Sequence, residues 1–178
     1  MKLCDVNFKE IKPKYGTTSK YFIDDNKKYF MKIPKLYKEN NILEREILIL
    51  KLLNENNFDW CPKLLYYDSE SIITEYCGES INYENIPDDF EEQIGKILLD
   101  LKSVNVKHND IWMIGKEPEF LVKNNKIYLI DFGWSSINDD FSCGDINISS
   151  EKKPHGIADD SLVIEYLKKM KKKNEIQG

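Results

Sequence analysis

The sequence predicts an α+β fold of two lobes, in which a small antiparallel sheet with one helix precedes a mainly helical part. Three observations favour it: β-type runs separated by turn signals occupy residues 12–33, one long amphipathic helix follows them, and a hairpin lies between two later helices. The length of 178 residues suffices for one compact domain but not for two full-sized ones. We place an N-terminal lobe at residues 1–77 and a C-terminal lobe at residues 78–178.

The first half is predicted to contain several strands and a single helix. Turn signals rich in Gly, Ser, Asp and Asn separate the three early runs, and Pro34 ends the third. Within that third run, Phe30 and Lys32 share one face of the strand, because successive side chains point to opposite faces. A helix over residues 38–53 and two strands over residues 63–68 and 71–76 are predicted to follow.

One carboxylate falls on the apolar face of this helix. Residues 42, 46, 49 and 53 are spaced i, i+4, i+7 and i+11, so Glu46 lies in the apolar stripe, whereas Glu44 lies in a wetter row. A carboxylate in an apolar environment is costly unless a cation meets it. The pattern therefore predicts a basic partner for Glu46.

The second half is predicted to contain a helix, a loop, a β-hairpin and a final helix, over residues 90–103, 106–119, 120–130 and 159–172. The loop carries His108, Asn109 and Asp110. The hairpin ends in Asp131-Phe132-Gly133, which places a carboxylate at a strand end, where it can face a cleft.

Composition disfavours several functional classes. Lys and Arg total 26 against 31 Asp and Glu, and the resulting net charge of −5 disfavours a general nucleic-acid binder. The longest apolar run, residues 47–50, is too short to span a bilayer, and the first residues lack the apolar stretch of a secretion signal. The four cysteines form no C-x-x-C pair, so we expect free thiols and a cytoplasmic protein.

The chemical candidates occur in a distinctive order. The strand residue Lys32 precedes the helix residue Glu46, an H-x-D motif ending in Asp110 follows a later helix, and a D-F-G beginning at Asp131 ends a strand. Over residues 12–136 this order resembles the protein kinase-like fold. The small atypical kinases are the most similar, namely the kinase of the KEOPS assembly, the RIO kinases and the lipopolysaccharide-core-type kinases. The resemblance implies two lobes, the second strongly truncated.

The resemblance also implies catalytic roles and two ligands, ATP and Mg²⁺. Lys32 would bind the α- and β-phosphates, and Glu46 would be its helix partner. Asp110 would orient the acceptor hydroxyl, and Asp131 would bind magnesium. Since phosphoryl transfer depends mainly on positioning and charge neutralisation, these residue types suit the chemistry.

Further positions would bind the nucleotide. Thr74 matches the gatekeeper, and the Glu75 carbonyl and Cys77 amide would bond the adenine. The phosphate-binding loop would comprise Gly16, Thr17, Thr18 and Ser19. With one glycine in place of several, this segment has a plain β-turn as its alternative.

A second magnesium ligand is less regular. The family has an asparagine five residues after the catalytic aspartate, where this chain has Gly115. The simplest alignment puts Glu119 in that metal-binding position, with Glu117 as the fallback and a solvated turn as the alternative for both. Asn109 replaces the arginine that reads a phosphorylated loop, so we expect activity independent of such phosphorylation.

The sequence thus predicts a minimal kinase that transfers the γ-phosphoryl group of ATP to a hydroxyl, with protein serine or threonine, including its own Ser135 or Ser136, as the first expectation. A small-molecule or sugar kinase of the same fold and a pseudokinase that only binds nucleotide or acts as a scaffold are the alternatives. The lysine-rich run Lys168–Lys173 indicates either a solvated helix end or a contact for an RNA, a membrane surface or a protein partner.

Overall fold

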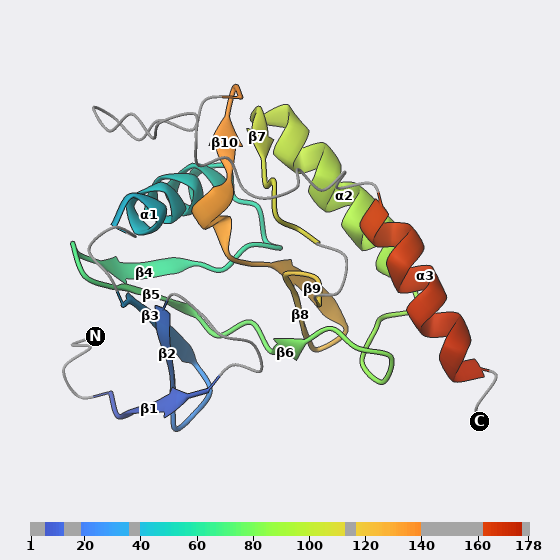
Figure 1. Cartoon of the computed structure of the whole chain (residues 1–178), viewed down its shortest axis with the longest axis horizontal. Helices are drawn as coiled ribbons and strands as arrows, with labels where there is room; N and C mark the ends of the chain where they lie inside the picture. Colours follow the sequence, from blue (N-terminus) through green and yellow to red (C-terminus); the bar gives the residue numbers. More distant parts are fainter. Residues whose placement is uncertain (1–5, 13–18, 36–39, 113–116, 140–161, 176–178) are drawn as a thin grey trace.

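The computed structural model describes residues 6–12, 19–35, 40–112, 117–139 and 162–175, which form a two-lobed α+β fold (Figure 1). The first lobe is a five-stranded antiparallel sheet in the order β1-β2-β3-β5-β4, with helix α1 lying along it. Its elements are β1 (Phe8–Ile11), β2 (Ser19–Asp24), β3 (Tyr29–Pro34), α1 (Asn40–Glu55), β4 (Leu64–Tyr67) and β5 (Ile72–Glu75).

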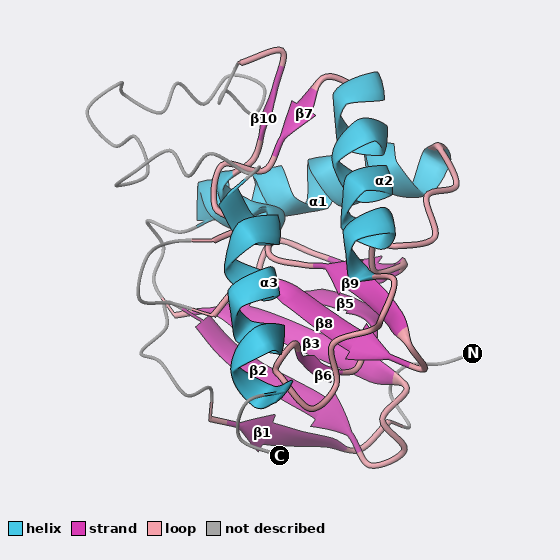
Figure 2. Cartoon of the chain, turned by 90° about the vertical axis from the view of Figure 1, so that its right-hand side faces the viewer, coloured by secondary structure: helices cyan, strands magenta, loops and turns pink. Residues whose placement is uncertain are grey.

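The second lobe consists of two long helices and short strands. Its elements are β6 (Glu79–Ser80), α2 (Phe90–Ser103), β7 (Val106–Lys107), β8 (Phe120–Lys123), β9 (Lys126–Leu129), the 3-10 turn η3 (Phe132–Trp134), β10 (Ser136–Ile137) and α3 (Leu162–Glu175). The β8–β9 hairpin pairs with β6, and β7 pairs with β10. Helices α2 and α3 lie side by side (Figures 1 and 2). The division of the lobes at Gly78 stays a prediction.

The predicted order of elements is confirmed, with corrections at several boundaries. Helix α2 has the predicted bounds. The prediction for the first strand is wrong, because β1 (Phe8–Ile11) lies wholly before the expected range of residues 12–33, and Ser19 belongs to β2 rather than to a turn. The two-residue strands β6, β7 and β10 were not predicted. A pair of residues carries no periodicity, so such strands depend on the partner that the tertiary fold provides.

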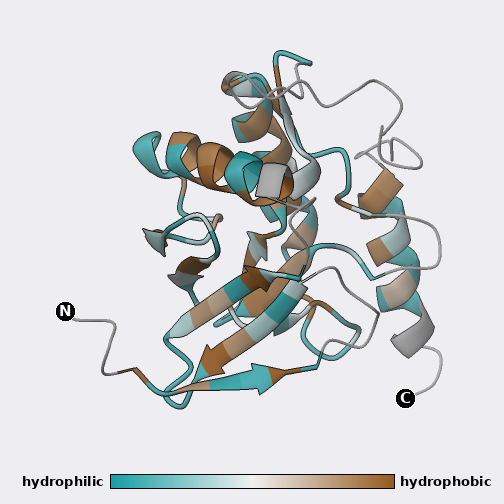
Figure 3. Cartoon of the chain, turned by 60° about the vertical axis from the view of Figure 1, so that its left-hand side comes forward, coloured by the Kyte–Doolittle hydropathy of each residue, from teal (hydrophilic) through white to brown (hydrophobic). Residues whose placement is uncertain are grey.

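The core follows the predicted apolar stripe of α1. Leu43, Ile49, Leu50 and Leu53 are at most 1% exposed, whereas Glu44 lies at the surface. Hydrophobic and hydrophilic segments alternate along the strands of the sheet (Figure 3). Within the sheet, Ile72 and Ile73 of β5 are buried, whereas Leu65, Tyr66 and Tyr67 of β4 are exposed.

Part of the lysine run of helix α3 forms ion pairs at the N-terminal end of α2. The Lys168 ammonium lies 2.8 Å from the Glu91 carboxylate, and the Lys171 ammonium lies 2.6 Å from the Asp88 carboxylate. These contacts match the solvated-helix interpretation, and an RNA or protein partner for the run stays a prediction. Among the described helices, none combines the length and the apolar character needed to cross a bilayer.

Candidate active site between the lobes

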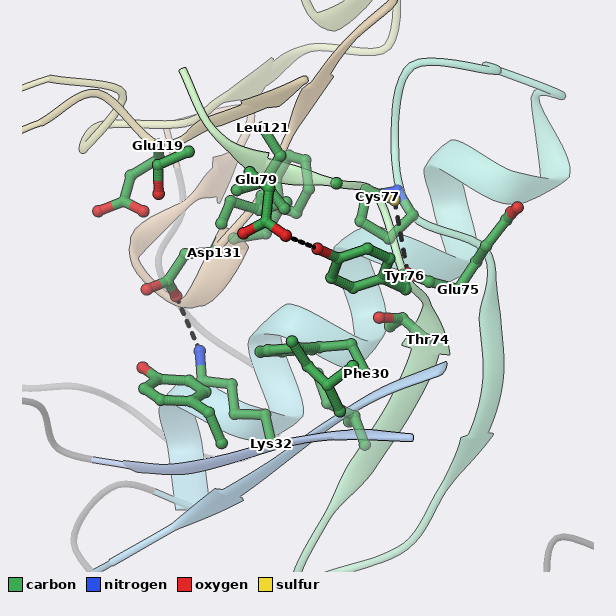
Figure 4. Close-up of a pocket in the computed structure, with 18 of the residues that line it drawn as sticks. Phe30, Lys32, Thr74, Glu75, Tyr76, Cys77, Glu79, Glu119, Leu121 and Asp131 are labelled. Carbon is green, nitrogen blue, oxygen red and sulfur yellow. Dashed lines mark hydrogen bonds and ion pairs between the residues drawn. The ribbon is translucent and has the colours of Figure 1, made fainter. Parts of the chain in front are cut away.

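A cavity of about 360 Å³ lies between the sheet and the β8–β9 hairpin (Figure 4). One face of the sheet forms one wall of the cavity, because Phe30 and Lys32 of β3 point to the same side and pair with Thr74 and Ile72 of β5. Leu121 of β8 lies across the cavity from Phe30 (Figure 4). The volume falls in the range of small-ligand sites.

Lys32 forms two ion pairs at one end of this cavity. Its ammonium donates to the Glu46 carboxylate at 2.6 Å. It also donates to the Asp131 carboxylate at 2.8 Å (Figure 4). The side chains of Lys32 and Glu46 are each 6% exposed, whereas that of Asp131 is 33% exposed toward the cavity. The basic partner predicted for Glu46 is therefore confirmed as Lys32.

Lys32, Glu46 and Asp131 change one another's pKa values. Burial disfavours the ammonium, but Asp131 and Glu46 outweigh it and raise the pKa of Lys32 well above its usual range. Burial raises the pKa of Glu46, and Lys32 offsets part of this effect. Burial also opposes ionisation of Asp131, but Lys32 reverses it and lowers the pKa of that carboxyl. One ammonium facing two carboxylates leaves a negative site, which suits a cation at the exposed Asp131.

The D-F-G segment is held in one conformation by α1. Asp131 has a left-handed backbone with φ of 59°, which is uncommon for a residue other than glycine. The guanidinium of Arg45 donates to the Gly133 carbonyl at 3.1 Å. A Cβ on Gly133 would lie 2.2 Å from a methyl carbon of Ile42, so only glycine allows this approach. Helix α1 thus positions both Glu46 and the backbone that carries Asp131.

His108 connects the catalytic-loop candidate Asp110 to the same segment. Its Nε2 lies 2.8 Å from the Ile130 carbonyl, which can only accept, so Nε2 carries the proton. Its Nδ1 then accepts from the Asp110 backbone N–H at 3.3 Å. The imidazole also packs edge-on against Phe132. Because His108 is fully buried, it serves as a structural link rather than a base that meets substrate.

Acid is expected to destabilise the fold through His108. Burial lowers the pKa of this imidazole to about 4, below the value of about 6.5 in an unfolded chain. As pH falls, the unfolded chain binds the proton first, so stability is lost between about pH 6.5 and pH 4, by about 2 kcal/mol at pH 5. Urea unfolding at several pH values measures this slope, which His108→Gln should reduce. The same substitution at His155, which lies outside the described residues, is the control.

Asn109 ties the catalytic loop to the segment after D-F-G. Its side-chain amide donates to the Lys107 carbonyl at 3.2 Å, to the Trp134 carbonyl at 3.1 Å and to the Ser136 hydroxyl at 3.1 Å. The residue is 5% exposed and has φ of 66°, a conformation that asparagine tolerates better than most residues. A neutral amide within the chain therefore braces this loop.

Replacing Asn109 by alanine is expected to lower the free energy of unfolding by about 1–3 kcal/mol, because buried acceptors lose their donor. Asn124→Ala is a matched control, since Asn124 also has a positive φ of 52° but sits in an exposed turn. Urea denaturation compares the two. Equal losses in both variants would mean that backbone strain, not the hydrogen bonds, explains the effect.

The strand that leads out of the sheet holds polar contacts that the sequence analysis missed. The Tyr76 hydroxyl donates to Glu79 at 2.6 Å (Figure 4). Lys27 from the β2–β3 turn donates to the same carboxylate at 2.9 Å. The Lys123 ammonium donates to the Tyr76 carbonyl at 2.7 Å. The alternation of Ile72 and Thr74 along β5 is the available signal, because its continuation puts Tyr76, the residue after the strand, on the cavity face.

The nucleotide and metal candidates divide into three groups. Thr74, Glu75, Cys77, Glu119 and Asp131 line the cavity together with Lys32 and Glu46. Ser19 is buried and is not among the lining residues. Asp110 is not among them either, and its backbone N–H is hydrogen-bonded to His108. Gly16, Thr17, Thr18 and Gly115 lie outside the described residues.

Glu119 lies close to Asp131 at the cavity (Figure 4). Its backbone carbonyl accepts from Ile130, the residue before Asp131, at 3.0 Å. In the described part of the chain, no group of three or more metal-binding side chains is assembled. Two carboxylates fit magnesium, which takes few protein ligands and completes its shell with water and phosphate oxygens.

Two serines that the sequence suggests as phosphoryl acceptors are buried in the structure. Ser135 and Ser136 are 0% and 1% exposed, and each is hydrogen-bonded to the catalytic loop. The expectation that either residue is phosphorylated in the folded chain is therefore wrong, because neither hydroxyl is accessible. The reason is packing: the strand β10 that carries Ser136 pairs with β7. Cys61 and Cys77 are free thiols, as predicted.

Comparison with known proteins gives a limited set of similarities. No family model matches the sequence. The chain is 30% identical over 129 residues to a protein of Metamycoplasma hominis described as "Protein LicA homolog". The alignment covers 69% of this chain and 49% of that protein, so the chain spans about half the length of this relative.

Similar solved structures include two aminoglycoside phosphotransferase structures. The streptomycin–ATP–APH(2'')-IIa ternary complex has a TM-score of 0.49 and 16% identity over 74% of this chain and 67% of that chain. The ADP-bound APH(2'')-Ib has a TM-score of 0.48 and 17% identity over 72% of this chain and 66% of that chain.

The elements of the site occur in one characteristic arrangement. A five-stranded antiparallel sheet carries a lysine that pairs with a glutamate of a single helix, and a hairpin of the second lobe ends in an aspartate bonded to the same lysine. This is the arrangement that phosphoryl-transfer proteins of the kinase type use to bracket a nucleotide. The chain has a two-lobed protein kinase-like fold.

Proposed function

We propose that this protein is an ATP- and magnesium-dependent phosphotransferase that transfers the γ-phosphoryl group to a hydroxyl. The observation that carries the proposal is the buried Lys32 ammonium, held between Glu46 and Asp131 at the end of a nucleotide-sized cavity. A buried ammonium with two carboxylates is an expensive arrangement for stability alone. Its position at a cavity favours a role in binding anionic oxygens.

Each residue has a defined task in this proposal. Lys32 binds oxygens of the α- and β-phosphates, and Glu46 keeps its side chain in place. Thr74, the Glu75 carbonyl and the Cys77 amide hold the base at the other end of the cavity. Asp131 and Glu119 would hold magnesium, which neutralises phosphate charge when it is bound.

The proposed transfer exchanges one phosphorus–oxygen bond for another and moves one proton to Asp110. The acceptor oxygen forms a bond to the γ-phosphorus while the bond from that phosphorus to the β-phosphate oxygen breaks. Asp110 orients the hydroxyl and accepts its proton. The acceptor is a protein serine or threonine or a small-molecule hydroxyl, and the burial of Ser135 and Ser136 directs the search to acceptors other than these two.

The test combines binding with turnover. Magnesium and ATP at 100 times the dissociation constant should stabilise the fold by about 2.7 kcal/mol in a thermal-shift assay. Labelled ATP with panels of protein and small-molecule acceptors, analysed for labelled product, then identifies the acceptor class. Stabilisation without hydrolysis or transfer would instead indicate a nucleotide-binding pseudokinase. Absence of any stabilisation by ATP would contradict the proposal.

A further inference from the structure

A tyrosine of β2 faces the charged end of the cavity. Tyr21 pairs directly with Lys32 in the antiparallel register of β2 and β3, so the two side chains share one face of the sheet. Tyr21 lines the cavity together with Lys32 and Asp131. The sequence analysis did not identify it, although the alternation along β2 puts Tyr21 and Ile23 on one side.

The ring and the hydroxyl of Tyr21 are fixed by different neighbours. The ring stacks on Phe30 with a centroid distance of 5.7 Å and an interplanar angle of 27°. The phenol oxygen is hydrogen-bonded to the hydroxyl of Ser19, which is 3% exposed. Either hydroxyl can donate or accept in this pair, so the Tyr21 hydroxyl can turn its proton to a ligand in the cavity while the serine hydroxyl donates to the phenol oxygen.

The strand register and the cavity lining place the Tyr21 side chain beside Lys32, at the end of the cavity where phosphates would lie. Burial raises the pKa of Tyr21 to about 12, and the charges of Lys32, Asp131 and Glu46 also act on it. The phenol is therefore neutral and protonated at physiological pH. A neutral donor can bond an anion without adding charge to a site that already contains one ammonium and two carboxylates.

We propose that the Tyr21 hydroxyl donates a hydrogen bond to the phosphate chain of bound ATP. The proposal rests on the proposed function, because Lys32 and Asp131 mark the place of the phosphates only if the cavity binds ATP. It assigns a phosphate-binding role to a sheet residue outside the loop of residues 16–19. Stacking on Phe30 limits the freedom of the ring, so little side-chain entropy is lost when the bond forms.

The experiment compares Tyr21→Phe with the wild-type chain for two ligands, magnesium with ATP and adenosine alone. Phenylalanine keeps the ring stacked on Phe30 and removes only the hydroxyl. The dissociation constant for ATP, from isothermal titration calorimetry, is expected to rise about tenfold, as for a hydrogen bond to a charged group. Adenosine affinity, measured by displacement of a fluorescent nucleotide, should change less than twofold because adenosine has no phosphate.

Tyr66→Phe is the matched control. Tyr66 lies on β4 outside the cavity, and its hydroxyl donates to Asp68 at 3.0 Å, so its loss should leave ATP affinity unchanged. Unchanged or tighter ATP binding by Tyr21→Phe would overturn the role of Tyr21 and leave the proposed function intact. An equal loss for ATP and adenosine would also overturn it, since the hydroxyl would then shape the cavity as a whole. A wild-type chain without ATP affinity would overturn both proposals.

Discussion

Asp131→Asn is expected to abolish magnesium-dependent stabilisation by ATP and to lower kcat/KM at least a thousandfold. Asparagine keeps the size of the side chain but removes the charge that faces the cavity, where Asp131 is 33% exposed. Loss of a metal-binding carboxylate removes several kcal/mol of charge stabilisation from phosphoryl transfer, and each 1.36 kcal/mol corresponds to about a tenfold change in rate. Thermal shift with and without magnesium, followed by steady-state kinetics, measures both effects.

The control for this variant is Asp139→Asn, which removes an exposed carboxylate that pairs with Lys107 away from the cavity. We expect its nucleotide binding to equal that of the wild type. If Asp131→Asn retained magnesium-dependent stabilisation, the metal would be held by other residues, and the role assigned to D-F-G would be wrong. The folded state of Asp131→Asn is verified separately by urea denaturation.

Lys32→Met is expected to lower the free energy of unfolding by about 3–5 kcal/mol, because it leaves the buried Glu46 carboxylate without its cation. The double variant Lys32→Met with Glu46→Leu should recover much of this loss, since an apolar pair of similar volume can replace a buried ion pair. A double-mutant cycle on urea-unfolding free energies measures the coupling. Lys96→Met is the control, because the Lys96 side chain is 61% exposed and its pairing with Asp100 is worth less than about 1 kcal/mol.

The pH dependence of Lys32→Met provides a second measurement. Without the ammonium, burial raises the pKa of Glu46 further, so the folded variant binds a proton at a pH where the unfolded chain does not. Relative to the wild type, which also contains His108, the stability of the variant should therefore increase as pH falls from neutral toward the pKa of free glutamate. A loss that is small and independent of pH would show that Glu46 is solvated in the folded chain, in conflict with its burial.

Local sequence patterns were sufficient to predict the longer helices and strands and the need for a cation near Glu46. The spacing of apolar residues in α1 was sufficient to predict both its buried face and the presence of Glu46 on that face, because helical periodicity depends only on the chain itself. The alternation in β3 likewise put Phe30 and Lys32 on one side. The need for a cation near Glu46 then followed from the cost of burying charge.

Contacts between segments that are distant in the sequence could not be predicted from these local patterns. The pairing of β7 with β10 joins residues more than twenty positions apart, and so do the hydrogen bonds of Asn109 to Trp134 and Ser136. No periodicity encodes such contacts. The burial of Ser135 and Ser136 depends on this pairing, which is why polar residues after D-F-G were taken for exposed acceptors. Tyr21 was missed for the same reason, since its neighbours Phe30 and Lys32 come from another strand.

The sequence by itself determined which candidate catalytic groups the protein has, namely Lys32, Glu46, Asp110 and Asp131, and the order in which they occur. Side-chain chemistry and local periodicity can be read without the tertiary structure. Only the tertiary structure decided that Lys32 meets Glu46 and Asp131 within 3 Å and that Asp110 is connected through His108. Such meetings depend on how the strands of the sheet and the hairpin of the second lobe pack together. Packing is a property of the whole fold, since each contact is set by residues far away in sequence.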